Sequence, residues 1–191
     1  MATAIPSIAC LGVIGRNNNP LHITIFPSHD PATNTSRQPV RTPLQFSLLL
    51  SSCLDVFDLR LRSTTGPVSG DLGLLHAVDE RLAAYGYETN TGVRFIVVVD
   101  MRGRRADGRL LAERVGKGAA GAAAVGLREG EMKPVFKAMQ TAYIKLLQNP
   151  FYDPDEHSPP NGVGGKKITS RTFAEDMKRI GESWIPGVNA L

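Results

Sequence analysis

The sequence has few cysteines and no long apolar run, and each shortage excludes a class of protein. Its 191 residues include two cysteines, Cys10 and Cys53, which form neither a CxxC pair nor a Cys/His zinc spacing. A disulfide framework is therefore excluded. No stretch approaches the roughly 20 apolar residues of a membrane-spanning helix, and no Lys or Arg precedes the apolar N-terminal stretch, as a signal peptide requires. We expect one soluble intracellular domain over residues 1–191.

Patterns for catalysis and cofactor binding are also missing. Residues 116–121 read GKGAAG, but no strand precedes them and no helix follows, as a dinucleotide site requires. The Gly-Lys run at residues 162–167 lacks the spacing of a phosphate loop. The acidic cluster at residues 153–157 reads either as a cation site or as a solvated turn, and the turn fits its prolines better. We expect no enzyme activity, cofactor or metal.

Positive charge is concentrated in one segment. The chain carries 22 Lys and Arg against 18 Asp and Glu, a net charge of +4. Residues 102–128 hold seven of the basic and two of the acidic residues, a net charge of +5, so the rest of the chain is close to neutral. This segment is rich in Gly and Ala, which predicts a flexible insertion. The basicity therefore does not indicate a nucleic-acid-binding fold.

Three apolar stretches predict strands. Residues 8–14 are almost wholly apolar, a turn rich in Asn follows, and Leu21, Ile23 and Ile25 then alternate with polar residues. This pattern predicts a hairpin. Residues 93–99 are β-branched and apolar on both faces, which predicts a central strand.

Three amphipathic stretches predict helices. One begins at Pro43 behind a capping box of Thr42 and Gln45 and ends before Ser63. The second contains a stripe from Met132 to Leu147, and the third begins at a Ser170 cap and includes Trp184. Propensity alone also favours a helix over residues 71–87. Strands covered on both sides by helices indicate an α/β or α+β fold in three layers.

Two acids of the first helix are candidate interaction residues. Asp55 has no Lys or Arg three or four residues onward, whereas Asp58 can pair with Arg62, as Glu175 can with Arg179 in the last helix. The two aspartates read either as a solvated helix face or as interface acids that meet a partner. The apolar stripes of the helices read either as core or as docking surface.

Four segments together resemble one family, the sedlin-like subunits of the transport protein particle (TRAPP) complex. They occur in the family's order and include an NPFY element at residues 149–152. The segments are IACLGVIGRNNNPLHITIFP, LLHAVDERLAAYGYETNTGVRFIVVVDM, KAMQTAYIKLLQNPFYDPDEHSP and GKKITSRTFAEDMKRIGESWIPG.

The resemblance implies a longin-like (sedlin-type) three-layer fold. This fold has a five-stranded antiparallel sheet, with the first two long helices on one face and the C-terminal helix on the other. The resemblance also implies strands at Leu72–Asp79 and Leu82–Asn90, against the helix that propensity favours. Two loops depart from the family pattern, at residues 31–41 and 102–130, and we expect both to be flexible insertions into the single domain.

The resemblance further implies a non-catalytic subunit or assembly factor. Family members belong to a tethering complex that promotes nucleotide exchange on Rab GTPases in traffic between endoplasmic reticulum and Golgi. The implied partners are other TRAPP subunits and, through them, a Rab GTPase and the membrane surface. The candidate contact residues are Asp55, Asp58, Phe151 and Tyr152. A longin-type adaptor related to SNAREs or coats, outside TRAPP, is the alternative.

Overall fold

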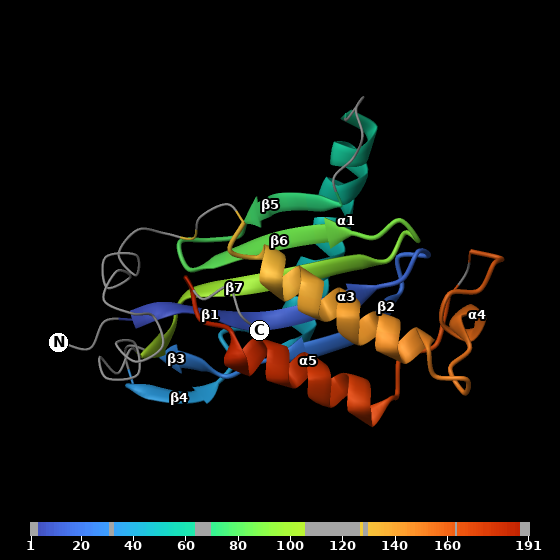
Figure 1. The fold of residues 1–191 in the computed structure, drawn as a ribbon. Helices are drawn as coiled ribbons and strands as arrows, with labels where there is room; N and C mark the ends of the chain where they lie inside the picture. The colour runs from blue at the N-terminus through green and yellow to red at the C-terminus, as the bar shows by residue number, and fades with distance from the viewer. Residues whose placement is uncertain are drawn as a thin grey trace.

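The protein folds into a sheet between layers of helices (Figure 1). This computed structural model describes residues 4–30, 33–63, 70–105, 127, 130–162 and 164–187. In chain order the elements are β1 (Ala4–Ile14), β2 (Pro20–Ile25), β3 (Ser28–Asp30), β4 (Thr35–Gln38), α1 (Pro43–Ser63), β5 (Asp71–Ala77), β6 (Leu82–Glu88), β7 (Arg94–Arg105), α3 (Lys133–Leu147), α4 (Pro154–His157) and α5 (Arg171–Ser183).

The main sheet has five antiparallel strands in the order β2-β1-β7-β6-β5. The predicted hairpin is confirmed, because β1 and β2 pair from Cys10 opposite Ile25 to Val13 opposite His22. Its turn contains Asn18 with a φ of 58°, a left-handed conformation that Asn tolerates. The predicted apolar strand is β7, which lies in the middle of the sheet and is buried along residues 95–100.

Strands β5 and β6 replace the helix that propensity favours over residues 71–87. The propensity-based interpretation is wrong, and the strands implied by the family resemblance are confirmed. A side chain at Gly86 would lie 2.5 Å from Leu75 and 2.6 Å from Phe57, so this strand needs glycine where α1 crosses it. Pairing with β7 and packing under α1 thus override the local helix preference.

Helix α1 begins at the predicted capping box. The Thr42 amide donates to Gln45 Oε1 at 2.9 Å, and the Gln45 amide donates to Thr42 Oγ1 at 3.3 Å. One side of α1 packs on the sheet through Phe46, Leu50, Cys53 and Phe57, all buried. Burial raises the pKa of Cys53 to about 11 and that of Cys10, in the same cluster, to about 12, so both remain thiols.

Helices α3 and α5 pack together on the opposite face of the sheet. The prediction that the first two long helices share a face is therefore wrong, because α3 lies with α5 instead of α1 (Figure 1). The reason is an aromatic core: Phe136 of α3 stacks on Tyr87 at 5.6 Å, and Tyr143 meets Phe95 at 6.1 Å and Phe173 of α5 at 6.5 Å. The three-layer arrangement itself is as predicted.

The predicted Ser170 cap of α5 is confirmed, but the predicted ion pair is not. Ser170 Oγ accepts from the Phe173 amide at 3.4 Å. Glu175 pairs with Arg171 one turn before it at 2.8 Å, and Arg179 pairs with Asp176. The expected Glu175 to Arg179 pair is therefore wrong, because Glu175 pairs with Arg171 and Arg179 pairs with the nearer Asp176.

A small hairpin and a buried ion pair close one end of the sheet. Residues 35–38, expected in a flexible loop, form β4 and pair with β3. Asp100 of β7 is fully buried, and Arg81 donates to its two carboxylate oxygens at 2.7 and 2.8 Å. Ser28 of β3 also donates to Asp100, and Arg81 donates to the His29 carbonyl at 2.5 Å. This polar clasp (Ser28, His29, Arg81 and Asp100) holds β3 against β7.

Most of the predicted basic insertion at residues 102–130 lies outside the described residues. Its first four residues extend β7 as far as Arg105. Within the part of the chain that the structure describes, no helix is both long enough and apolar enough to cross a membrane.

Candidate functional site

An apolar stripe runs along the outward side of α1. Leu44, Leu48 and Leu59 are 70%, 63% and 66% exposed. Leu44 and Leu48 are about one helical turn apart, as are Asp55 and Leu59, and about three full turns separate the two pairs. The four residues therefore share one side of the helix, opposite the buried Phe46 and Phe57. We call them the outer stripe of α1.

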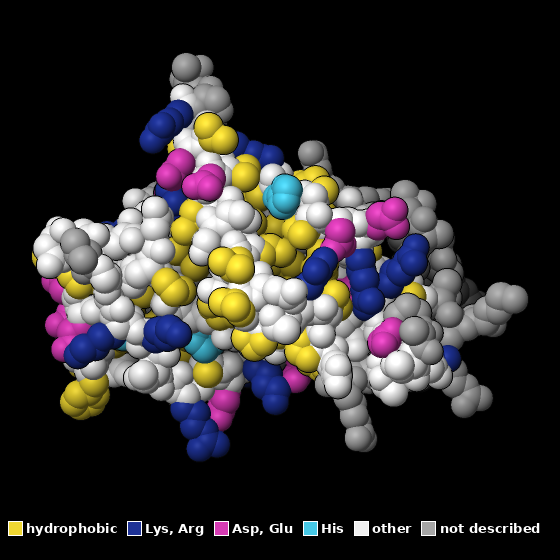
Figure 2. Space-filling view, turned by 180° about the vertical axis from the view of Figure 1, so that it is seen from behind, with side chains coloured by type: hydrophobic (Ala, Val, Ile, Leu, Met, Phe, Trp, Pro, Cys, Tyr) yellow, Lys and Arg dark blue, Asp and Glu magenta, His cyan; other side chains and the backbone are white. Residues whose placement is uncertain are grey.

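Asp55 is exposed and is the acidic residue within this stripe. Figure 2 shows the face of the molecule that carries α1, where apolar side chains gather with a few charged groups among them. An acid on the same side of a helix as exposed leucines, one turn from Leu59, is suited to a partner that brings an apolar patch with one cation.

Asp58 is fastened to the sheet instead. Arg94 at the start of β7 donates to its carboxylate at 2.7 Å, so the predicted pair with Arg62 is wrong. The Arg94 guanidinium also lies 5.2 Å from the centre of the Phe57 ring and donates to Asn18 at 2.9 Å. Asp58 thus helps to fix α1 on the sheet and does not face outward as Asp55 does.

The end of α1 projects beyond β5, an edge strand of the sheet (Figure 1). Arg60 donates to the Leu72 and Leu74 carbonyls of β5, both at 2.5 Å. Leu74 is one of the exposed large apolar residues, as is Leu59 in the same end of α1. Arg60 thus fastens the end of α1 to β5.

The NPFY element forms a corner after α3. Asn149 Oδ1 accepts from the Phe151 amide at 3.1 Å, and the Asn149 carbonyl accepts from the Tyr152 amide at 3.0 Å. This turn leaves Phe151 95% exposed. Ile144 and Leu147, on the outer side of the last turns of α3, are exposed as well. The corner therefore presents a second, smaller apolar surface.

Tyr152 points the other way, into the protein. Its ring stacks on His157 of α4, with centroids 4.5 Å apart and planes within 11°. Burial raises the pKa of Tyr152, and the neighbouring Tyr143 raises it further. The side chain packs against the aromatic core, so it holds the corner in place while Phe151 stays free.

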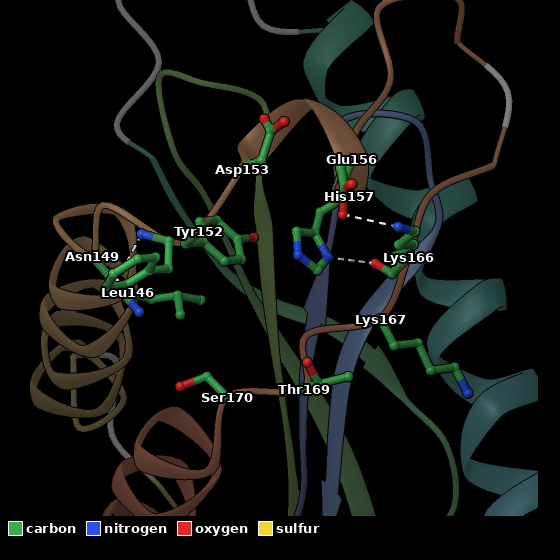
Figure 3. A pocket seen from close by; sticks show the side chains of 11 residues that line it. Leu146, Asn149, Tyr152, Asp153, Glu156, His157, Lys166, Lys167, Thr169 and Ser170 are labelled. Carbon is green, nitrogen blue, oxygen red and sulfur yellow. Dashed lines mark hydrogen bonds and ion pairs between the residues drawn. The ribbon is translucent and has the colours of Figure 1, made fainter.

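A cavity of about 700 Å³ lies between α3, α4 and the segment before α5 (Figure 3). The stacked Tyr152 and His157 form one side, and Thr169 and Ser170 face them. His157 Nδ1 donates to the Lys166 carbonyl at 2.8 Å, and Lys166 Nζ pairs with Glu156 at 2.9 Å. The Glu156 and Lys166 charges at this cavity are therefore used in holding α4 to the following segment.

The corner is also bound to the β1–β2 turn. Arg16 donates to the Ser158 carbonyl at 2.6 Å, and Asn19 donates to the His157 carbonyl at 2.8 Å. Asp153 caps α4 by accepting from the Asp155 amide at 2.9 Å. The acidic cluster thus serves as a turn, and no group of three or more His, Cys, Asp or Glu in the described ranges is arranged to hold a metal ion.

The four predicted contact residues do not form one site. Asp55 and Asp58 lie on α1, on one face of the sheet, whereas Phe151 and Tyr152 follow α3 on the other face. The residues that sequence reasoning missed are Leu44, Leu48 and Leu59. Their signal is present in the sequence, because leucines on both sides of one helix exceed what a single buried face needs.

Comparison with known proteins identifies the family. The sequence profile of the sedlin family matches residues 13–183. The chain belongs to the sedlin family. The match begins in β1 and ends with α5, so it covers the outer stripe of α1 and the NPFY corner. The sheet and its helices form the longin-like fold that the resemblance implied.

Relatives of this sedlin-family chain carry one name, "Trafficking protein particle complex subunit 2-like protein". Those of Bos taurus and Mus musculus are 27% identical to it over 169 residues, which cover 86% of this chain and 89% of each relative. That of Dictyostelium discoideum is 25% identical over 174 residues, which cover 91% of this chain and 95% of the relative. The sedlin-family chain is thus similar to these proteins over nearly their whole length.

Proposed function

We propose that this sedlin-family chain is a non-catalytic subunit or assembly factor of a TRAPP tethering complex. Support comes from relatives named as subunit-2-like proteins of the trafficking protein particle complex, which match it over nearly their whole length. In this proposal the chain acts by protein–protein contacts within a complex that promotes nucleotide exchange on a Rab GTPase. It reaches endoplasmic reticulum and Golgi membranes from the cytoplasm as a peripheral member of that complex.

The observation that carries the proposal is the outer stripe of α1. Three leucines more than 60% exposed lie on one side of α1 over about four turns, and a partner that covers them removes their apolar surface from water. Covering them yields about 25 cal/mol per Å² of apolar surface, and a stable interface buries roughly 1,200–2,000 Å² in total. A neighbouring subunit with an apolar groove would cover the stripe.

Asp55 supplies the specificity of this contact. Asp55 lies one helical turn from Leu59 on the same side of α1, so a partner that covers this side must also bring a Lys, an Arg or hydrogen-bond donors to its carboxylate. A partner without such a group would leave a charge buried and unpaired, which disfavours wrong pairings. Asp58, bound to Arg94, contributes by holding α1 in position.

Phe151 provides a second, smaller contact. An aromatic side chain that is 95% exposed is a common anchor for a partner pocket. Tyr152 contributes indirectly, because its stacking on His157 fixes the turn that presents Phe151. The two surfaces lie on opposite faces of the sheet, so one chain can contact two neighbours.

The test is reconstitution of the complex with variants of the outer stripe. The chain is co-expressed with the small TRAPP subunits of its own organism, and the subunits that co-purify are identified. Leu44→Ser with Leu48→Ser, and separately Asp55→Lys, should abolish co-purification, while thermal melting of the isolated chain shifts by no more than a few degrees.

A charge-matched control lies on the opposite face. Glu175→Lys makes the same charge change as Asp55→Lys at an exposed position of α5 and should leave co-purification intact. Co-purification of the Asp55→Lys chain at the wild-type level would remove Asp55 from the interface. Loss of binding together with a large fall in melting temperature would show that the outer-stripe residues stabilise the fold instead of contacting a partner. Absence of any TRAPP subunit with the wild-type chain would overturn the proposal.

A further inference from the structure

The outer edge of β2 presents backbone hydrogen-bonding groups away from the sheet. Phe26 N–H donates to the Ala9 carbonyl at 2.9 Å, so the even-numbered residues of this stretch face β1. By the alternation of an antiparallel strand, the N–H and C=O groups of Leu21, Ile23 and Ile25 then point outward. β2 is the last strand on its side of the sheet.

The chain itself already pairs with the first of these positions. The Ile168 amide donates to the Leu21 carbonyl at 2.8 Å. Residues 165–170 form neither helix nor strand, and the backbone then turns into α5 at Arg171. No further backbone hydrogen bond reaches Ile23 or Ile25 from the described residues outside β1. The edge thus accepts an extended backbone at one position and leaves the next two unused.

The opposite edge of the sheet is protected, and β2 is not. β5 has two register shifts, a Gly73 φ of 63°, and Arg60 bound to two of its carbonyls. Irregular geometry and a charged side chain are the usual means of preventing edge pairing. β2 keeps regular register from His22 to Ile25 and contains no Lys, Arg, Asp or Glu.

The side chains around β2 show where an added strand would fit. Ile23 and Ile25 are half-buried and pack against the cluster under α1, so their apolar surface lies on the same side of the sheet as the outer stripe. On the other side, His22 packs edge-on against Phe173 of α5 at 5.3 Å and hydrogen-bonds Thr24 at 2.8 Å. Pro20 and Pro27 bound the open stretch, which limits pairing to a short segment.

We propose that the Ile23–Ile25 edge of β2 binds an extended polypeptide segment of a neighbouring subunit, which adds a sixth strand to the sheet. The identity of the partner as a subunit of the same complex rests on the proposed function above. Backbone donors and acceptors in alternation are what an unpaired edge needs, and an extended peptide supplies them in the matching order. Apolar side chains on alternate residues of that segment would cover Ile23 and Ile25.

Hydrogen exchange tests the edge directly. In the isolated chain, the amides of His22 and Thr24 face β1 and should exchange slowly, whereas those of Ile23 and Ile25 should exchange fast. In the complex reconstituted with the small TRAPP subunits, the exchange of the Ile23 and Ile25 amides should slow at least tenfold. The measurement is mass spectrometry with fragmentation that resolves single amides.

Each other outcome has one meaning. A complex that protects α1 but leaves Ile23 and Ile25 exchanging fast would overturn the edge inference and keep the proposed function. Failure to form any complex would overturn the proposed function. An isolated chain that is already dimeric, with both amides protected, would replace the neighbouring subunit by a second copy and overturn the assignment of the partner.

Two substitutions at one position separate backbone pairing from side-chain contact. Ile23→Pro removes one outward N–H and places a ring on the edge, which an edge strand tolerates. It should weaken the affinity for the partner about tenfold or more. Ile23→Thr keeps the backbone and a β-branched side chain, and should weaken affinity less than about threefold. Equal losses would show that only the side chain matters and would overturn strand addition, and hydrogen exchange decides if the proline variant fails to fold.

Discussion

The two faces of the sheet are covered to different extents. α3 and α5 pack side by side on one face, while α1 lies on the other as its one long helix in the part of the chain that the structure describes (Figure 1). Five strands spaced about 4.8 Å apart make a surface roughly 20 Å wide, and one helix covers about 10 Å of it. Two helices therefore complete one face, whereas α1 leaves strips uncovered beside it.

The residues beside α1 fit this difference. On the one-helix face, partly buried apolar side chains from outside α1 pack at the margin of the cluster under it: Ile23, Ile25, Val40, Leu72 and Val78. The polar clasp around Asp100 closes one end of this face. We infer that the two-helix face supplies most of the folding stability and that the one-helix face is left for partners.

The largest expected effect is loss of Trp184, at the end of α5. This side chain is 1% exposed and belongs to the two-helix core. Trp184→Ala should lower the free energy of unfolding by about 3–5 kcal/mol, because it leaves a cavity between helix and sheet. Urea denaturation followed by circular dichroism measures this. Leu48→Ala on the outer stripe is the control and should change stability by less than about 0.5 kcal/mol. Similar losses of unfolding free energy in both variants would contradict the inference that the two-helix face supplies most of the stability.

The polar clasp should have the next largest effect. Asp100→Ala removes the fully buried carboxylate that accepts from Arg81 and Ser28, and leaves the guanidinium with Ser28 Oγ and the His29 carbonyl as acceptors and no opposite charge in the clasp. The loss should be about 3 kcal/mol, the lower end for a broken buried pair, because Arg81 is partly exposed. The measurement is again urea denaturation. Asp155→Ala, which removes an exposed aspartate 3.6 Å from Arg16, should cost almost nothing. If Asp100→Ala lowers the unfolding free energy no more than Asp155→Ala does, the clasp does not stabilise this end of the one-helix face.

The capping box of α1 should have a smaller effect. Thr42→Ala removes the acceptor of the Gln45 amide and should cost about 1 kcal/mol, because it leaves a donor of the first turn of α1 without its side-chain cap. Thr141→Ala, an exposed threonine within α3, makes the same chemical change without a cap and should cost nothing or stabilise slightly. Equal effects of the two variants in thermal melting would show that the cap does not anchor α1.

Local patterns predicted the elements that contain their own signals. The capping box at Thr42, the Ser170 cap, the β1–β2 hairpin and the apolar strand β7 all appear where the sequence indicated. The strands β5 and β6 needed the family resemblance, since their residues favour helix and only pairing with β7 makes them strands. The side chosen by α3 is decided by contacts of Phe136 and Tyr143 with residues distant in sequence, which periodicity does not reveal.

The surroundings of the candidate contact residues follow from the sequence to different extents. Asp55 is exposed on α1 as an interface acid requires, but Asp58 pairs with Arg94 of β7, a partner 36 positions away that helical spacing does not indicate. Phe151 and Tyr152 are neighbours in sequence with opposite roles, since the turn at Asn149 exposes one and buries most of the other. The β2 edge was not predicted, because an unpaired strand edge depends on sheet order and not on residue type.

The smallest expected effect is a pH dependence from His22, on the two-helix side of β2. Burial lowers the pKa of His22, so the unfolded chain takes up a proton at a higher pH than the folded chain does. As pH falls below about 6.5, the unfolded state binds more protons and stability decreases. His22→Gln keeps a hydrogen-bonding group near Thr24 but does not titrate, so its unfolding free energy should fall less between pH 7 and pH 5 than that of the wild type. Urea denaturation at both pH values measures the change in unfolding free energy. An equal change in the wild type and in His22→Gln would show that burial of His22 does not contribute to the pH dependence of stability.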